Sequence, residues 1–347
     1  MGKTFKTPVL LVHGASDNAN RTWIHPWEQT MPSNLSHEKQ GFARSLSDLG
    51  YSVFALTFPH NQGDNFYQAK HIANAISRIK ILLGRANDAN FEVDVIGHSK
   101  GNVPIRLYCS DANDLFPKKK FLPLFRGDVR KFIAIASPMR GVDTAFRYYG
   151  YNLYLAGKSA SNAPLGVDRF FIYGNWINTG KRSVFTTFGN YFPGQCQILY
   201  NLVQDATVPL GPDSYTLDGN LTMFNLYFGG TTLFIRSAGI TKAIEQGERL
   251  IYRLEERGIA PKIRLGVIAG SNGFVTYATP EEIVPMPYEL LTPPGDGVVF
   301  LASSLFTDNI LKRGAKLIGK STLDLNHVEI ARDRKTLEIL DDWLRSP

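Results

Sequence analysis

The amino-acid sequence predicts an α/β fold with a mostly parallel central sheet flanked by helices. Aliphatic runs alternate with helical stretches from residue 8 to about residue 136, and the same alternation returns after residue 262. Several of the runs are almost unbroken, which is typical of strands buried on both faces, as in parallel sheets. Strand–helix–strand repeats of this kind join neighbouring parallel strands through right-handed crossovers.

Each element of the first part has a local signal. The aliphatic run of residues 8–12 is the first expected strand, and Gly14 ends it. The longest helix is expected over residues 65–83, where isoleucine and leucine recur at helical spacing. These apolar residues are Ile72, Ile76, Ile79 and Leu83. The other expected elements are a helix at 41–49, strands at 51–56, 91–96 and 131–136, and a helix at 100–110 between the last two strands.

Residues 141–261 interrupt the alternation. Nineteen of the 41 aromatic residues of the chain lie between residues 141 and 237. This density fits a helical subdomain that buries its own Phe and Tyr residues, a cap or lid whose apolar underside faces a ligand, or both at once. We therefore divide the chain into a first core part (1–140), an inserted cap or lid region (141–261) and a second core part (262–347).

The second core part repeats the strand and helix pattern. Its expected elements are a strand at 263–269, a helix at 297–312, a strand at 315–322 and a closing helix with Leu337, Leu340 and Leu344 on one face.

The sharpest motif is a Gly-His-Ser-Lys-Gly run at residues 97–101, between an expected strand and an expected helix. A nucleophile elbow of the G-x-S-x-G type requires this context, because the serine adopts a strained conformation and the two glycines remove side chains that would clash in the turn. Ser99 is therefore the candidate nucleophile.

A serine hydroxyl needs a base, and histidine has a suitable proton affinity near neutral pH. Hydrolases with this elbow carry their triad in the chain order Ser, acid, His. Of the seven histidines only His327 follows Ser99, and it comes just after the last expected strand. Asp296, in a tight loop before a helix, is the preferred orienting acid. Asp205 is the alternative, since it also lies in a loop between Ser99 and His327.

Acyl transfer also needs donors for a developing oxyanion, and main-chain N–H groups supply them without reorganisation. We expect one from Lys100, directly after the nucleophile, and one from Ala15, in the loop after the first strand. The Lys100 side chain is expected to be solvated. His13 is expected to bond its own loop rather than to act as a base.

These motifs resemble the bacterial true lipases of the α/β-hydrolase fold. The similar segments follow one another in order: 8–14 for the oxyanion loop, 97–101 for the elbow, 136–141 after the next strand, 295–299 for the acid loop and 326–330 for the histidine loop. The resemblance implies a triad of Ser99, Asp296 and His327, oxyanion donors at Ala15 and Lys100, and a mobile lid within the insertion.

Two features depart from that family. Asn102 stands where many relatives have a further glycine, which indicates different packing behind the elbow. Many relatives bind a structural calcium through an acid at the position of Glu329, but no aspartate occurs between Asp218 and Asp296 to supply the partner carboxylate. We expect no required cofactor, with calcium at Glu329 left as an alternative.

Composition limits the partners. The net charge of +7 is spread over 347 residues, and its densest basic stretch, residues 118–120, is expected to be a solvated loop. No nucleic-acid motif accompanies it, so no nucleic-acid partner is expected. The most apolar stretch, residues 221–235, is shorter than the ~18 apolar residues of a membrane span, so a soluble protein is expected. The sequence does not determine its oligomeric state.

Cysteine usage and the start of the chain leave the compartment open. Cys109 and Cys196 allow at most one disulfide. The first expected strand begins too early for a signal peptide to precede it. The protein is therefore expected to be either intracellular or secreted and already processed.

The sequence favours a serine carboxylic-ester hydrolase that cleaves lipid-like acyl esters through an acyl-enzyme. Polyester depolymerase, thioesterase or acyltransferase chemistry on the same triad is the alternative, because the fold and nucleophile do not fix the leaving group. A non-catalytic binding protein on this fold would usually lack a triad residue, and none is missing here.

Overall fold

The computed structural model describes residues 7–26, 40–147, 169–172, 175–178, 193–211, 220–231, 236–273 and 294–347. Its centre is a six-stranded sheet in the order β10-β9-β4-β3-β1-β2, and every neighbouring pair runs parallel. The strands are β1 (Val9–Val12), β2 (Val53–Leu56), β3 (Val93–His98), β4 (Val129–Ile135), β9 (Arg264–Gly270) and β10 (Lys316–Leu323). The predicted fold class is confirmed in its architecture: the chain is an α/β protein with a parallel central sheet flanked by helices.

The order of the strands reverses at β1. The chain passes from β1 to β2 on one side, and returns to β3 on the other side of β1. From β3 the sheet then grows outward through β4, β9 and β10. In open α/β sheets ligands bind at such a reversal, outside the carboxyl ends of the strands. A binding crevice is therefore expected where β1 and β3 end.

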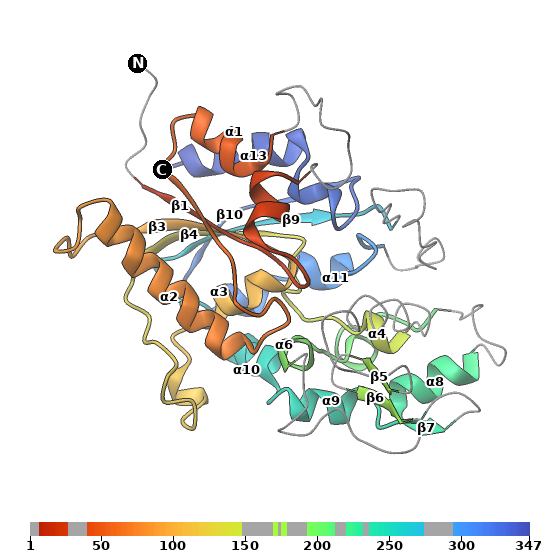
Figure 1. The fold of residues 1–347 in the computed structure, drawn as a ribbon. Helices are drawn as coiled ribbons and strands as arrows, with labels where there is room; N and C mark the ends of the chain where they lie inside the picture. Colours follow the sequence, from red (N-terminus) through yellow and green to blue (C-terminus); the bar gives the residue numbers. More distant parts are fainter. Residues whose placement is uncertain are drawn as a thin grey trace.

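Helices cover both faces of the sheet (Figure 1). On one face lie α1 (Phe42–Asp48) and α13 (Arg334–Arg345), whereas α2 (Asn65–Leu82), α3 (Asn102–Cys109) and α10 (Leu250–Arg257) lie on the other. Residues that alternate along a strand point to opposite faces. Five of the strands contribute to both hydrophobic cores, whereas the edge strand β10 contributes only to the core with α1 and α13.

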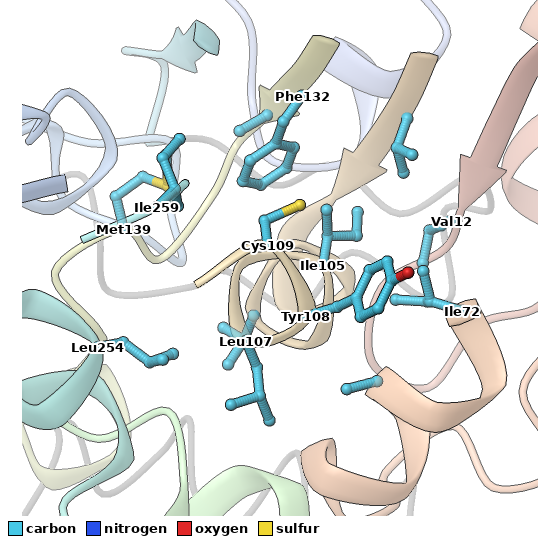
Figure 2. Packing of buried hydrophobic residues seen from close by; sticks show 14 of the residues in the cluster. Val12, Ile72, Ile105, Leu107, Tyr108, Cys109, Phe132, Met139, Leu254 and Ile259 are labelled. Carbon is cyan, nitrogen blue, oxygen red and sulfur yellow. The ribbon is translucent and has the colours of Figure 1, made fainter. Parts of the chain in front are cut away.

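The strand β1 shows this division clearly. Val9 and Leu11 belong to the cluster with α1 and α13, whereas Leu10 and Val12 belong to the cluster with α2, α3 and α10. Figure 2 shows the second cluster around α3, where Ile105 and Tyr108 face the strands and α2. The helix α3, which follows the candidate nucleophile, is thus packed from several sides.

The predicted long helix ends earlier than its apolar pattern. The carboxylate of Asp64 accepts a hydrogen bond from the Phe66 N–H and starts α2. Ile72, Ile76 and Ile79 are buried as expected. The prediction for Leu83 was wrong, since its side chain is 37% exposed. The reason is that α2 ends at Leu82 and the chain turns away at Gly84, which has a φ of 68°.

The prediction of a single helix over residues 297–312 was also wrong. The structure has two short helices there, α11 (Leu301–Ser304) and α12 (Asp308–Leu311). Residues before α11 form a closed loop instead, held by a bridge between Gly295 and Phe300 and by a left-handed turn at Gly297 with φ of 93°. This loop carries Asp296.

Small elements lie between β4 and β9 in the chain. They are α4 (Thr144–Arg147), β5 (Arg169–Ile172), β6 (Asn175–Asn178), α6 (Pro193–Cys196), α7 (Leu202–Asp205), α8 (Asn220–Phe228), β7 (Gly230–Thr231), β8 (Arg236–Ser237) and α9 (Ile240–Gln246). Most of them gather at one end of the molecule (Figure 1). Several side chains there form a separate cluster, which includes Phe146, Tyr227 and Ile244. The helix α10 differs, because Leu250 and Leu254 pack into the core of the sheet.

Short helical turns complete the described fold. They are η1 (Asn20–Ile24), η3 (Ser99–Gly101), η4 (Asn113–Leu115) and η7 (Glu329–Ala331). In the described part of the chain, no helix is both long and apolar enough to cross a membrane.

The basic stretch and the cysteines are also described. Lys118 and Lys120 are exposed in a loop, as predicted, whereas Lys119 forms an ion pair with Glu248. Cys109 and Cys196 are both buried and do not form a disulfide.

Candidate active site

The turn at residues 97–101 is a sharp elbow between β3 and α3. Ser99 has a φ of 52°, in the left-handed region that residues with a Cβ rarely adopt. The two glycines are required by the packing: a Cβ on Gly97 would lie 2.2 Å from Asn102 Oδ1, and one on Gly101 would lie 2.2 Å from the His13 carbonyl oxygen. The sequence therefore presents the Ser99 side chain at the carboxyl end of the sheet.

His327 meets Ser99 from the loop that follows β10. The imidazole Nε2 lies 2.8 Å from Ser99 Oγ, although 228 positions separate the two residues in the chain. The main chain is held as well, because the His327 N–H donates to the Asp296 carbonyl oxygen at 2.9 Å. Both the side chain and the backbone of His327 are therefore fixed next to Ser99.

Asp296 orients the imidazole from the other side. Its Oδ2 lies 2.8 Å from His327 Nδ1, and its side chain is fully buried. The other oxygen, Oδ1, accepts hydrogen bonds from the N–H groups of Val298 and Val299 at 2.9 and 2.7 Å. With Asp296 as acceptor, Nδ1 carries the proton and Nε2 is the acceptor for the Ser99 hydroxyl.

Asp205, the alternative acid, is engaged elsewhere. It ends α7, and its Oδ2 accepts a hydrogen bond from the Tyr252 hydroxyl at 2.6 Å. The structure thus brings together Ser99, His327 and Asp296, and it places Asp205 against α10.

The loop after β1 lies against the elbow. The register pairs Val12 of β1 with Gly97 of β3. A Cβ on Gly14 would lie 2.8 Å from the Cβ of Ser99, so the backbone of this loop passes directly beside the nucleophile. Ala15 follows Gly14, and Lys100 follows Ser99. The two N–H groups predicted as oxyanion donors therefore belong to segments that flank Ser99.

The Lys100 side chain is buried, and the prediction that it is solvated was wrong. Only 2% of it is exposed, and its Nζ donates to the Gly63 carbonyl at 3.0 Å and to Gln68 Oε1 at 2.6 Å. The segment at Gly194 covers it, since a Cβ there would lie 2.4 Å from Lys100 Cε. This contact comes from the insertion, which the local sequence around Lys100 does not reveal. Burial lowers the pKa of Lys100 to about 7.

His13 bonds its own loop, as predicted. Its Nδ1 donates to the Gly14 carbonyl at 2.8 Å, and its Nε2 accepts from the Phe58 N–H at 3.0 Å. Burial lowers the pKa of His13, so the ring is neutral near pH 7. It braces the loop that carries Ala15.

This geometry agrees with the comparison to known families. Residues 6–149 match the lipase (class 2) family. The matched segment holds the elbow and the loop after β1, and ends before Asp296 and His327. The family match supports a hydrolase of the lipase or esterase type.

Solved structures of similar shape span nearly the whole chain. Staphylococcus hyicus lipase is 13% identical, with 99% of this chain and 97% of that chain covered and a TM-score of 0.48. Lipase 1 from Pelosinus fermentans is 12% identical, with 98% and 99% covered and a TM-score of 0.48. EstA from Clostridium botulinum is 12% identical, with 99% and 88% covered and a TM-score of 0.48. No curated protein sequence matches the chain.

The described surroundings of Glu329, where the lipase resemblance raised calcium, include a cationic side chain. The N–H of Glu329 donates to Asn326 Oδ1 at 2.9 Å, and its charge acts on Arg332, whose pKa burial lowers. No group of three or more His, Cys, Asp and Glu side chains in the described ranges is placed to hold a metal ion. An adjacent guanidinium group disfavours a cation at this carboxylate.

Sequence reasoning missed the contacts of His98, and for Asn102 it indicated different packing behind the elbow without naming the contacts. His98 lies next to His327, with ring centroids 5.1 Å apart, and edge-on to Trp23. Asn102 donates hydrogen bonds to two main-chain carbonyls behind Ser99. The contacts of His98 and the bond from Asn102 to the Ile135 carbonyl gave no local signal, because they join segments that are distant in sequence. The departure at Asn102 was the one available hint.

Proposed function

We propose that the protein is a serine carboxylic-ester hydrolase that cleaves lipid-like acyl esters through an acyl-enzyme. The observation that carries the proposal is the chain of two 2.8 Å contacts from Ser99 Oγ to the His327 imidazole and from the imidazole to the buried Asp296. A nucleophile, a base and an orienter in hydrogen-bond contact are the arrangement that activates a serine hydroxyl.

In the first half of the reaction, Ser99 Oγ attacks the ester carbonyl carbon while His327 Nε2 takes the hydroxyl proton. Asp296 stabilises the imidazolium that forms. The carbonyl oxygen becomes an oxyanion, and we assign the N–H groups of Ala15 and Lys100 as its donors. The bond to the alkoxy oxygen then breaks, His327 gives its proton to the leaving alcohol, and the acyl group stays on Ser99.

In the second half, water attacks the acyl-enzyme. His327 takes a proton from the water, the same N–H groups stabilise the second oxyanion, and the acid leaves as Ser99 recovers its proton. Every proton transfer in this scheme is assigned to His327.

The proposed substrate class rests on the region between β4 and β9. We assign residues 141–261 as the cap, and suggest that it receives an apolar acyl chain. The described helix α8 supports this, because it carries no charged residue and exposes Leu221, Phe224 and Phe228 on its surface. It packs on α4, and the Thr144 hydroxyl at the start of α4 donates to the Val298 carbonyl in the acid loop at 2.6 Å.

Covalent labelling tests the proposal directly. A fluorophosphonate should label Ser99 of the wild-type protein, and should not label Ser99→Ala, which should also lose roughly 10⁴-fold in turnover of p-nitrophenyl esters. A panel of esters from short to long chains, with emulsified triglyceride, a thioester and a polyester film, identifies the preferred substrate. Residual turnover by Ser99→Ala above a tenth of the wild-type rate would exclude Ser99 as the nucleophile.

A further inference from the structure

The side chain of Asn102 lies directly behind the nucleophile. It is 1% exposed, and its Nδ2 donates to the main-chain carbonyl of Ser99 at 3.0 Å and to that of Ile135 at 3.1 Å. Both amide hydrogens are thus used, and each reaches a carbonyl at the end of a different strand. One amide group therefore links the end of β3 to the end of β4.

Both linked points are conformationally strained. Ser99 has a φ of 52°, and Ala136, which follows Ile135, has a φ of 47°. The left-handed region is unfavourable for residues that have a Cβ, so such residues persist where the surrounding structure holds them. The Asn102 amide bonds one carbonyl at each of these turns.

The orientation of the Asn102 amide follows from its surroundings. With the amide reversed, its oxygen would face two carbonyl oxygens and lose both hydrogen bonds. Its Oδ1 instead occupies the space that Gly97 leaves open, 2.2 Å from where a Cβ on Gly97 would lie. Among the described residues, that oxygen has no hydrogen-bond partner. The two donated bonds therefore account for the presence of an amide at this buried position.

The carbonyl of Ser99 and the N–H of Lys100 belong to one peptide unit, and a peptide unit is planar. A side chain that holds the Ser99 carbonyl therefore also fixes the direction of the Lys100 N–H. This is the N–H that the proposed mechanism assigns to the oxyanion.

We infer that Asn102 is a positioning residue, which sets the direction of the Lys100 N–H and of the Ser99 side chain by holding the Ser99 carbonyl. The inference rests on the proposed function. It explains in physical terms why an asparagine stands where the family resemblance expects a glycine: the amide supplies a cross-link between two strained turns that a glycine cannot supply.

The test compares Asn102→Ala with Asn102→Ser. The alanine variant loses both bonds, whereas a serine hydroxyl in a helix can bond the carbonyl three or four residues earlier, which here includes that of Ser99. For Asn102→Ala we expect kcat and the rate of fluorophosphonate labelling to fall by roughly 10- to 100-fold with KM within twofold, as for a small misplacement of reacting groups. Asn102→Ser should recover at least threefold over the alanine variant.

Asn113→Ala is the matched control. The Asn113 amide also donates to a main-chain carbonyl, that of Leu122, and its oxygen likewise has no partner among the described residues, but it lies in the turn after α3. This variant should keep the wild-type kcat and labelling rate. Melting temperatures of all variants are measured first, and assays are run well below them.

The outcomes separate the inference from the function on which it rests. Failure of the fluorophosphonate to label the wild-type protein would overturn the proposed function itself. A labelled wild type together with a folded Asn102→Ala that keeps kcat and labelling within twofold would overturn only the role of Asn102. If Asn102→Ala does not fold, it is replaced by Asn102→Leu, which has nearly the same shape and no donor, and a folded Asn102→Leu that keeps kcat and labelling within twofold of the wild type would overturn the role of Asn102.

Discussion

The imidazole of His98 donates a hydrogen bond from Nε2 to the main-chain carbonyl of His327, 2.8 Å away. The residue immediately before the candidate nucleophile thus holds the backbone of the candidate base. His98 is buried between Trp23 and His327. Two loops distant in sequence are joined at this point, so the distance from Ser99 to His327 is set by the backbone as well as by the side chains.

This buried histidine predicts a dependence of stability on pH. Burial lowers the pKa of His98 from 6.5 to about 4, so between these pH values the unfolded chain binds the proton more strongly than the folded one. Stability should be fully present above pH 6.5 and should fall as the pH drops toward 4, by up to roughly 3 kcal/mol from this group. The free energy of unfolding in urea at several pH values measures the slope.

The control for this prediction is His98→Gln, which keeps a donor for the His327 carbonyl but does not titrate. Its free energy of unfolding should change less between pH 6.5 and 4 than that of the wild type, because residue 98 no longer titrates. Some dependence should remain, because burial also lowers the pKa values of His13 and His71, which are present in both proteins. Equal slopes would show that His98 does not titrate in this range.

The two candidate acids should respond differently to an isosteric amide. Asp296→Asn should lose roughly 10⁴-fold in turnover, as in the serine-protease example on which the principle is built, because the amide favours the wrong tautomer of His327. Asp205→Asn should change turnover by less than about tenfold and lower the free energy of unfolding by no more than about 1 kcal/mol through its bond to Tyr252. Kinetics and melting are measured on both variants. An inactive Asp205→Asn beside an active Asp296→Asn would reverse the assignment.

Lys100 should make the protein more stable as the pH rises above 7. Its pKa of about 7 lies below the ordinary value of 10.5, so the folded state releases the proton first and gains stability relative to the unfolded chain up to about pH 10.5. Lys100→Met has a similar length and does not titrate. The difference in the free energy of unfolding between wild type and Lys100→Met should grow in favour of the wild type from pH 7 to pH 10. A constant difference would mean that Lys100 keeps an ordinary pKa.

A lid within residues 141–261 should produce a rise in rate at an interface. Apolar surface that is exposed on opening is favoured at an oil–water boundary, so the rate on a sparingly soluble ester should climb above its solubility limit. The measurement is initial rate against ester concentration through that limit. A smooth hyperbolic curve would argue against a closed lid and would leave the triad assignment unaffected.

The sequence by itself determined the strands of the sheet and the order in which the candidate catalytic residues occur along the chain. Buried strands read as aliphatic runs because both of their faces are covered, and the elbow is visible because strand, glycine, serine, glycine and helix follow one another locally. His327 was identifiable as the candidate base because it is the one histidine after Ser99. Local pattern was sufficient for each of these.

Contacts between distant segments were decided only by the tertiary structure. The buried state of Lys100 depends on Gly63, Gln68 and the chain at Gly194. The contact of His327 with Asp296 rather than with Asp205 depends on which loop reaches the imidazole. The two short helices after residue 300 replaced a predicted single helix because the closed loop around Asp296 uses the residues that would have begun it. Propensity and periodicity describe a segment against its own neighbours, whereas desolvation and hydrogen bonding depend on what packs over it from elsewhere in the chain.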